Sequence, residues 1–269
     1  MIHSMQKPTI SLVIPMFNEE ANIDHAIAYA VDALDEHAAE YEIVIVDDAS
    51  TDLSPEIVRH AASGNPRIRL IRHEFNQKLG ASLRTGFAAA QYELILYMDA
   101  DLPFDPDVLS RAIRAMKVTR ADVISGYRFD RTTEGLKRTV YTIIYNWMIR
   151  LLFNIYVRDI NFSFKLMKRE VLETINLRSE GSLIDAELIV KAHNHGFAIQ
   201  QIGLDYFPRV MGTSHLSGPD IIAKIFRELF ALYGDMRKRA PRPPRSDSTP
   251  PGVLSSASET AASESMAEQ

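Results

Sequence analysis

Two carboxylates one residue apart, Asp99 and Asp101, directly follow the apolar run Leu94–Met98. Carboxylate oxygens are the ligands that hard cations such as Mg²⁺ and Mn²⁺ prefer. The chain has no cysteine, so a thiolate metal site is excluded and a cation must be held by oxygen or histidine. An Asp-x-Asp pair is also common in solvated loops and helix caps, so the spacing alone leaves both interpretations open.

Polar residues also follow the two earlier apolar runs. Ile10–Ile14 leads into Pro15-Met-Phe-Asn-Glu-Glu20, which has no glycine, whereas a dinucleotide-binding fold would place a glycine-rich turn there. An NAD or FAD enzyme, and a nucleotidyltransferase with a glycine-rich phosphate loop, are therefore not expected. After Ile43–Val46 comes an acidic run in which Ser50 or Asp52 would cap a helix while Asp47 faces a ligand.

The elements that must position these residues alternate along the first half of the chain. We expect strands at Ile10–Ile14, Ile43–Val46, Ile68–Ile71, Leu94–Met98 and Val123–Ser125, with segments of helical apolar spacing between them. This alternation predicts an α/β domain with a mostly parallel sheet and helices on both faces. Ligands bind such sheets beyond the carboxyl ends of the strands, which is where the polar residues fall.

The second half of the chain is less regular. Two amphipathic stretches, Leu136–Val157 and Pro219–Tyr233, are interpreted as acceptor-side helices, and the sequence from Ala240 is rich in Pro, Arg, Ser, Ala and Glu. We therefore expect a catalytic domain over 1–218, an amphipathic basic helix over 219–240 and a disordered tail over 241–269.

Composition narrows the classes of partner. The net charge of −5 argues against nucleic acid as the main partner. The first residues lack a signal-peptide core and no segment is long and apolar enough to cross a bilayer, so we expect a cytoplasmic protein. Residues 220–245 carry seven basic and three acidic side chains beside apolar ones, which favours peripheral binding to anionic lipid at the cytosolic membrane face. The aromatic stretch Tyr141–Tyr156 fits core packing, a homodimer face or membrane contact.

Five short segments together resemble family 2 glycosyltransferases of the GT-A fold, which has a Rossmann-type sheet. They are Pro15–Glu19, Val46–Ser50, Met98–Asp101, Ser125–Arg128 and Arg158–Asp159, in that order and spacing. Within this family the chain is most similar to polyprenyl-phosphate (dolichyl-phosphate) mannose and glucose synthases, whose late Arg-x-x-Gly-x-Ser-Lys-Leu signature resembles Arg209–Leu216. The resemblance implies that a hexose moves from a GDP- or UDP-sugar, with inversion, to a dolichyl or undecaprenyl phosphate, with Mg or Mn as cofactor.

The resemblance also implies roles for individual residues. Asp159, Asp101 and Arg128 are implied as catalytic, Asp99 and Asp101 as metal ligands, and Pro15, Phe17, Glu19, Asp47, Asp48, Asp99 and Arg209 as nucleotide-sugar-binding. Guanidinium groups suit phosphate oxygens, which fits the two arginines. A phosphate acceptor is already ionised, so Asp159 would only orient groups, whereas a hydroxyl acceptor would make it the general base.

Departures from the family pattern lie mainly on the acceptor side. Pro103 stands where the family often has a further metal-ligating Gln, Asn161–Phe164 replaces a usual Thr-Ser-Gly-Phe, and His215 replaces the late lysine. The alternatives that stay open are a glycan or small-molecule hydroxyl acceptor, recruitment by a membrane partner protein, and a noncatalytic nucleotide-sugar or carbohydrate-binding protein.

Overall fold

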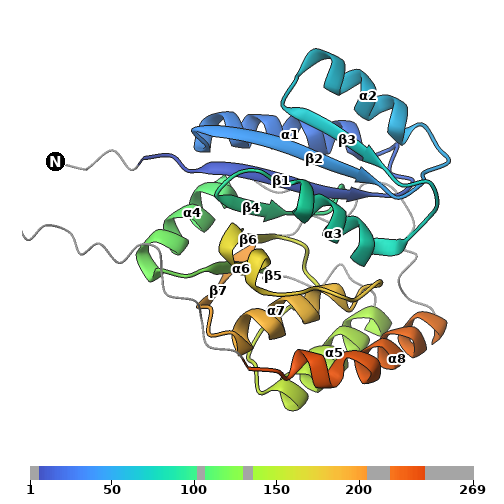
Figure 1. The fold of residues 1–269 in the computed structure, drawn as a ribbon, viewed down its shortest axis with the longest axis vertical. Coiled ribbons are helices and arrows are strands. Elements are labelled where there is room, and N and C mark those ends of the chain that lie inside the picture. The colour runs from blue at the N-terminus through green and yellow to red at the C-terminus, as the bar shows by residue number, and fades with distance from the viewer. Residues whose placement is uncertain (1–5, 102–106, 130–135, 205–218, 240–269) are drawn as a thin grey trace, which may run out of the picture.

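A seven-stranded mixed sheet forms the centre of the computed structural model, which describes residues 6–101, 107–129, 136–204 and 219–239. The strands lie in the order β3-β2-β1-β4-β6-β5-β7 (Figure 1). β6 is antiparallel to both of its neighbours, while the pairs within β1–β4 and the β5–β7 pair are parallel. The strands are β1 Thr9–Met16, β2 Glu40–Asp47, β3 Ile68–Arg72, β4 Leu94–Tyr97, β5 Val123–Arg128, β6 Lys165–Lys168 and β7 Ile199–Leu204.

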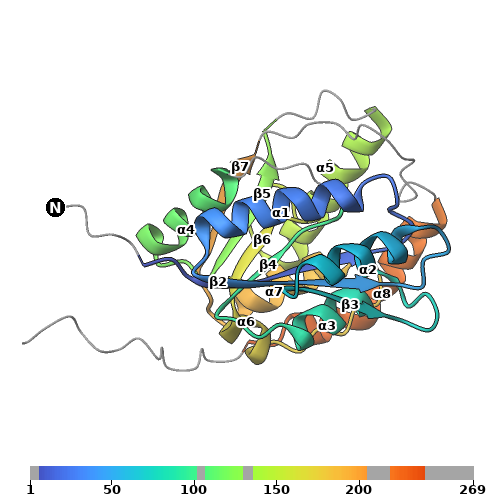
Figure 2. The ribbon, with the colours of Figure 1, turned by 90° about the horizontal axis from the view of Figure 1, so that it is seen from above.

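Helices cover both faces of this sheet (Figure 2). Successive strand residues point to opposite faces, so Leu12 and Ile14 enter one apolar core with α1, α2 and α4, while Val13 enters a second core with α3, α5 and α7. The predicted doubly covered, mostly parallel α/β fold is therefore confirmed. The helices are α1 Ile23–His37, α2 Ser54–Gly64, α3 Lys78–Ala89, α4 Asp107–Thr119, α5 Leu136–Phe153, α6 Arg169–Thr174, α7 Ile184–Asn194 and α8 Pro219–Met236.

The boundaries differ from the predicted ones in several places. β1 continues to Met16, so Pro15 lies inside the strand instead of after it. α5 ends at Phe153, four residues before the predicted end, and Asn154 follows it with a left-handed φ of 53°. β6 and β7 were not predicted at all. The predicted tail, 241–269, lies outside the described residues.

The last helix, α8, packs on α5 and α7 as part of the domain. The Phe153 and Tyr233 rings lie 5.5 Å apart between α5 and α8. Lys191 Nζ, on α7, lies 2.6 Å from Asp235 Oδ2 on α8, and Lys238 Nζ lies 2.8 Å from the other oxygen of that carboxylate. These ion pairs lower the pKa of Asp235 to about 2. Over the described residues, none of the helices combines the length and the apolar character needed to cross a bilayer.

Candidate functional site

The loops after β1 and β2 are joined by hydrogen bonds at the carboxyl edge of the sheet. Asn18 N donates to Ser50 Oγ at 2.9 Å, Glu19 N donates to Ser54 Oγ at 2.8 Å, and Thr51 N donates to Asn18 Oδ1 at 2.9 Å. The predicted pocket residue Phe17 is 46% exposed at this edge. The structure thus brings the predicted nucleotide-binding loops together, while Pro15 is buried within β1.

The two acidic residues that end β2 have different environments. Asp47 is fully buried; its Oδ1 accepts from Ser50 N at 3.0 Å, and Arg72 Nε lies 3.1 Å from its Oδ2. The Asp48 carboxylate accepts hydrogen bonds from the backbone N–H groups of Gln77, at 2.8 Å, and Lys78, at 2.7 Å. Its Oδ1 also lies 2.8 Å from His73 Nδ1. Asp48 therefore holds the turn that begins α3.

Helix α2 is capped differently from the two predicted alternatives. Its N-cap is Leu53. Asp52, one residue before the N-cap, bonds to the first residue of the helix: its Oδ1 accepts hydrogen bonds from Ser54 N at 3.0 Å and from Ser54 Oγ at 2.6 Å. The Ser50 hydroxyl instead accepts a hydrogen bond from the backbone N–H of Asn18 in the loop after β1. Both side chains order the edge of the site.

Asp99 and Asp101 follow β4 as predicted, and both are partly buried. Tyr97 Oη donates to Asp99 Oδ1 at 3.2 Å. Burial, followed by the nearby charges of Asp101 and Asp185, raises the pKa of Asp99 to about 7. Two carboxylates held this close in a poorly solvated place repel each other, which is an environment that a bound cation relieves.

The donor set at this point fits a divalent cation. Carboxylate oxygens are hard ligands, and the charge of a cation would offset the repulsion between Asp99 and Asp101. Within the described residues, no group of three or more His, Asp or Glu side chains is arranged to hold a metal. Asp99 and Asp101 are thus two oxygen-bearing side chains that this edge of the sheet offers to a cation.

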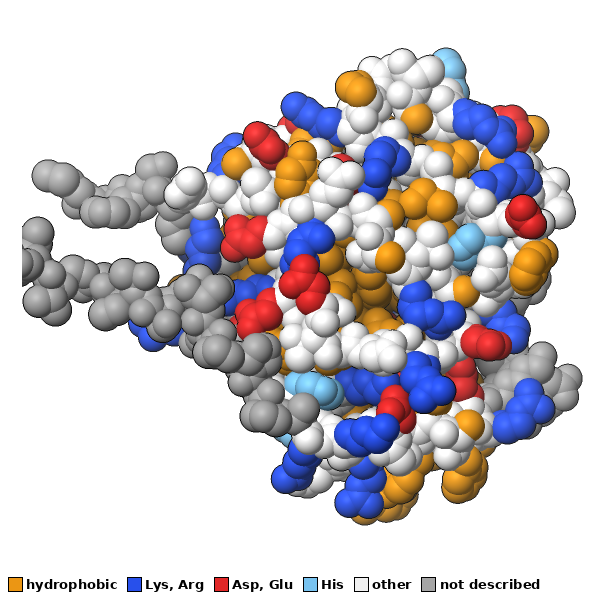
Figure 3. Space-filling model, in the orientation of Figure 1, with side chains coloured by type: hydrophobic (Ala, Val, Ile, Leu, Met, Phe, Trp, Pro, Cys, Tyr) orange, Lys and Arg blue, Asp and Glu red, His pale blue; other side chains and the backbone are white. Residues whose placement is uncertain are grey.

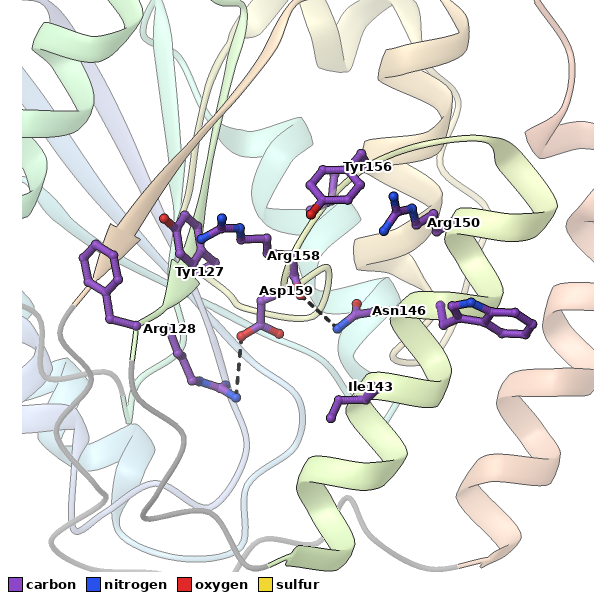
Figure 4. A pocket seen from close by; sticks show the side chains of 11 residues that line it. Tyr127, Arg128, Ile143, Asn146, Arg150, Tyr156, Arg158 and Asp159 are labelled. Atoms are coloured by element: carbon purple, nitrogen blue, oxygen red, sulfur yellow. Dashed lines mark hydrogen bonds and ion pairs between the residues drawn. The ribbon is translucent and has the colours of Figure 1, made fainter.

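Asp159 forms an ion pair with Arg128 from the end of β5. Arg128 Nη1 lies 3.8 Å from Asp159 Oδ2, and both side chains are largely withdrawn from solvent, at 11% and 1% exposure (Figure 4). The guanidinium of Arg128 also lies 5.1 Å from the centre of the Phe162 ring. The neighbouring Arg158 instead stacks over Tyr127 at 4.8 Å, so the adjacent Arg-Asp pair in the sequence is not an exposed ion pair.

A buried Lys–Asp pair links these two groups of residues. Lys165 Nζ lies 2.5 Å from Asp185 Oδ1 and donates to Phe162 O at 2.6 Å. Asp185 interacts electrostatically with both Asp99 and Asp159, so the carboxylates after β4 and Asp159 share one electrostatic neighbourhood. Sequence reasoning missed this pair; the available signal was a lysine directly before the apolar residues of the short strand β6, Lys165–Lys168.

A pocket of about 510 Å³ opens beside Asp159. Its walls come from α5, from the end of β5 and from the segment after α5 (Figure 4). Arg150, Trp147 and Tyr156 line it together with Arg128 and Arg158. No role for Arg150 was predicted. The predicted phosphate-binding Arg209 lies outside the described residues, and Glu19 accepts from Asn22 Nδ2 at 2.7 Å.

Comparison with known proteins matches residues 11–175, more than half of the chain, to the family model described as glycosyl transferase family 2. A polyprenol monophosphomannose synthase from Mycolicibacterium smegmatis is 28% identical over 228 residues, covering 80% of this chain and 84% of that protein. Glycosyltransferase AglD from Haloferax volcanii is 28% identical over 207 residues, covering 74% of this chain but only 33% of that protein.

Solved structures share the fold. Glucosyl-3-phosphoglycerate synthase from Mycobacterium tuberculosis, in complex with Mn²⁺, uridine diphosphate and phosphoglyceric acid, superposes with a TM-score of 0.67 at 20% identity, covering 87% of this chain and 80% of that one. A mannosyltransferase from Pyrobaculum calidifontis, in complex with GDP-mannose and Mn²⁺, gives a TM-score of 0.65 at 20% identity, covering 89% and 67%. At such identities the likeness establishes the GT-A-like fold.

Proposed function

The chain belongs to glycosyl transferase family 2, and from that premise we propose that it transfers a hexose from a GDP- or UDP-sugar to a polyprenyl phosphate. The observation that supports this best is that Asp185 interacts electrostatically both with Asp99, which neighbours Asp101, and with Asp159, the ion-pair partner of Arg128. A donor diphosphate needs cationic and metal contacts, and the transferred sugar must meet the acceptor beside it. Carboxylates beside a cationic side chain are residue types suited to both tasks, which supports the proposal.

On the donor side, we assign the nucleotide to the joined loops after β1 and β2. Phe17 lies exposed at their edge, and Glu19 and Asp47 belong to the hydrogen-bonded frame around it. Asp48 acts indirectly, by fixing the turn before α3. Asp99 and Asp101 would hold Mg²⁺ or Mn²⁺, which offsets the negative charge of the departing nucleoside diphosphate when it is bound. Pro15, buried in β1, supports the loop, and Arg209 is proposed as a further phosphate ligand.

In the proposed reaction, an acceptor oxygen forms a bond to the anomeric carbon while the bond from that carbon to the diphosphate oxygen breaks. The nucleoside diphosphate leaves with the electron pair, and direct displacement inverts the configuration. Arg128 is placed to bind a phosphate oxygen, since a guanidinium group offers several donors. With a phosphate acceptor no proton has to be removed, so Asp159 holds Arg128 and orients the reactants.

We further propose that the protein docks on the cytosolic membrane face through α5 and α8. Exposed apolar side chains project from these helices at the lower end of the molecule, with Lys and Arg side chains around them (Figure 3). Among them, Phe230 is 80%, Leu151 67% and Trp147 63% exposed. Apolar groups beside basic ones favour the interface of an anionic bilayer. Such docking would bring a lipid acceptor to the pocket beside α5.

Calorimetry with GDP and with UDP, each in Mn²⁺ and in chelator, tests the donor site. We expect one nucleotide to bind only with the cation, and Asp101→Asn to abolish that binding while its thermal unfolding stays that of the wild type. Asp32→Asn, an exposed carboxylate in the middle of α1, is the matched control. Equal affinity of the Asp101 variant and the wild type would contradict the metal-site proposal.

A transfer assay separates the remaining alternatives. Radiolabelled GDP-mannose and UDP-glucose are incubated with the protein and either a polyprenyl phosphate or a water-soluble hydroxyl or phosphate acceptor. Label in the lipid phase supports the proposed acceptor, whereas label only in a soluble product makes the acceptor a small molecule. Donor binding without any turnover would identify a noncatalytic nucleotide-sugar-binding protein.

A further inference from the structure

The described residues that line the pocket beside Asp159 bring three arginines to it. They are Arg128, Arg150 and Arg158, and the acidic side chain among the described lining residues is Asp159. Arg128 pairs with that carboxylate. Among the residues that the structure describes, neither Arg150 nor Arg158 forms an ion pair with an acidic side chain. Arg150 and Arg158 thus bring two guanidinium groups to the pocket in addition to the one that pairs with Asp159.

Aromatic rings hold these two guanidinium groups in place. Arg150 lies 4.0 Å from the centre of the Tyr156 ring, and Arg158 lies 4.8 Å from that of Tyr127. A guanidinium group over the face of an aromatic ring is attracted by the ring electrons, and this attraction does not use up its N–H donors. Stacking therefore orients each arginine while leaving its donors available to a ligand.

The backbone around Arg158 is fixed as well. Its N–H donates to Gln201 Oε1 at 2.8 Å, and its carbonyl accepts from Asn146 Nδ2 at 3.1 Å (Figure 4). Asn146 Oδ1 in turn accepts from Ile160 N at 3.2 Å. Asn146 thus ties the segment after α5 back onto α5, which sets the spacing between Arg158 and Arg150.

Local spacing explains why these side chains share one pocket. Ile143 lies three and four residues before Asn146 and Trp147, and Arg150 lies four and three residues after them, so the four lie on one face of α5. In the segment after α5, burial alternates: Ile155 and Val157 are buried, while Tyr156 and Arg158 are exposed on the pocket side. The two stretches therefore line one pocket, the first as a face of α5 and the second as a segment outside any helix or strand.

We propose that Arg150 and Arg158 form a binding site for the phosphomonoester group of the acceptor. This inference rests on the proposed function and assigns the acceptor's charged end to two residues outside the Arg128–Asp159 pair. A phosphomonoester carries close to two negative charges and several acceptor oxygens, which match two guanidinium groups. The apolar side chains of Ile143 and Trp147, 57% and 63% exposed, continue from the pocket onto the outer face of α5. That surface favours a hydrocarbon chain attached to the phosphate.

Trp147 provides a direct reporter, because it is the only tryptophan of the chain and lines the pocket. Its fluorescence is followed while the full-length protein is titrated with geranyl phosphate, with geraniol as the probe that lacks the anion. We expect a saturable change with geranyl phosphate alone. Arg150→Gln and Arg158→Gln should each weaken binding about tenfold or more, as expected for loss of hydrogen bonds to a charged group.

Control variants separate binding from folding. Arg114→Gln removes an exposed arginine on α4 and should bind like the wild type. Arg150→Lys and Arg158→Lys keep the charge but lose the planar fork, so they should recover part of the affinity. In the transfer assay, the two Gln variants should raise the KM for the acceptor and leave the KM for the sugar nucleotide unchanged.

The outcomes distinguish the source of the phosphate and the two proposals. Phosphoglyceric acid binding at least as tightly as geranyl phosphate, with the same dependence on Arg150 and Arg158, would establish the phosphomonoester site with a soluble acceptor. Wild-type affinity in both Gln variants would overturn the site. If geranyl phosphate binds and depends on Arg150 and Arg158 but neither GDP nor UDP binds, the phosphomonoester site stands and the proposed transferase reaction is overturned. If a nucleotide binds but geranyl phosphate binding does not depend on these arginines, the proposed reaction stands and the site is overturned.

Discussion

Replacement of Lys165 by Met tests the buried pair beneath the site. Lys165 is fully buried, its Nζ lies 2.5 Å from Asp185 Oδ1, and it also donates to Phe162 O. The Met side chain retains most of the volume but leaves a buried carboxylate and a carbonyl without their donor. Removing one member of a buried pair costs about 3–5 kcal/mol, a large part of the roughly 5–15 kcal/mol that stabilises a domain.

The cost should depend on pH with a defined sign. Burial raises the pKa of Asp185 and Lys165 opposes that rise, so the Met variant should raise the folded-state pKa further above the unfolded value. A group whose pKa is higher in the folded state contributes stability at low pH and loses it as pH rises. The free energy of unfolding of the Lys165→Met variant should therefore fall further below that of the wild type at pH 8 than at pH 5.

Urea unfolding followed by circular dichroism at both pH values measures this difference. Lys165→Met/Asp185→Leu is the control, because replacing both partners by apolar groups removes the unpaired charge and should restore most of the lost stability. The reasoning would be refuted by a single variant whose free energy of unfolding lies within about 1 kcal/mol of the wild-type value at pH 8. It would also be refuted by a double variant no more stable than the single one.

Three further predictions concern packing, charge and membrane docking. Gly80→Ala places a Cβ 2.1 Å from the carbonyl oxygen of Ser179, so it should lower the free energy of unfolding by about 1–3 kcal/mol. Gly64→Ala is the control, because its Cβ meets no atom within 4 Å and its free energy of unfolding should not fall. Urea midpoints measure both variants. Asp235→Asn should cost on the order of 1–2 kcal/mol above about pH 4. Because the folded pKa of Asp235 is depressed to about 2, its stabilisation is present above the unfolded pKa and the difference should vanish as pH falls through 2 in acid titrations. Phe230→Ser should weaken binding to anionic vesicles, measured by sedimentation, about tenfold. Phe75 is 65% exposed in the loop after β3, so Phe75→Ser is the control and should bind like the wild type. Equal binding of the two variants would contradict docking through α8.

The first half of the fold was predictable because its signals are local. β1, β2 and β4 are apolar runs buried on both faces, and the helices between them show apolar residues at helical spacing. β6 and β7 gave no comparable signal. β6 contains the fully buried Lys165, and β7 has only two fully buried residues among its six. Both strands are stabilised by partners far away in the sequence.

The candidate site divides in the same way. Asp99 and Asp101 were identified from their spacing after a strand, and the family match over 11–175 confirms the resemblance that gave them a role. The role itself stays a prediction. Arg158 is adjacent to Asp159 in the sequence, but the ion pair of Asp159 is with Arg128. The Arg158 side chain is exposed while that of Asp159 is buried, so adjacency in the chain does not make a contact.

The sequence by itself determined the alternating α/β architecture, the carboxylates at the strand ends and the family, because each depends on residue types at short, regular intervals. Only the tertiary structure decided which charges meet: Lys165 with Asp185, Arg128 with Asp159, and Arg150 and Arg158 on aromatic rings across one pocket. Those contacts join segments whose separation along the chain carries no information about distance in space. They are set by the packing of α5 and the segment after it against the sheet.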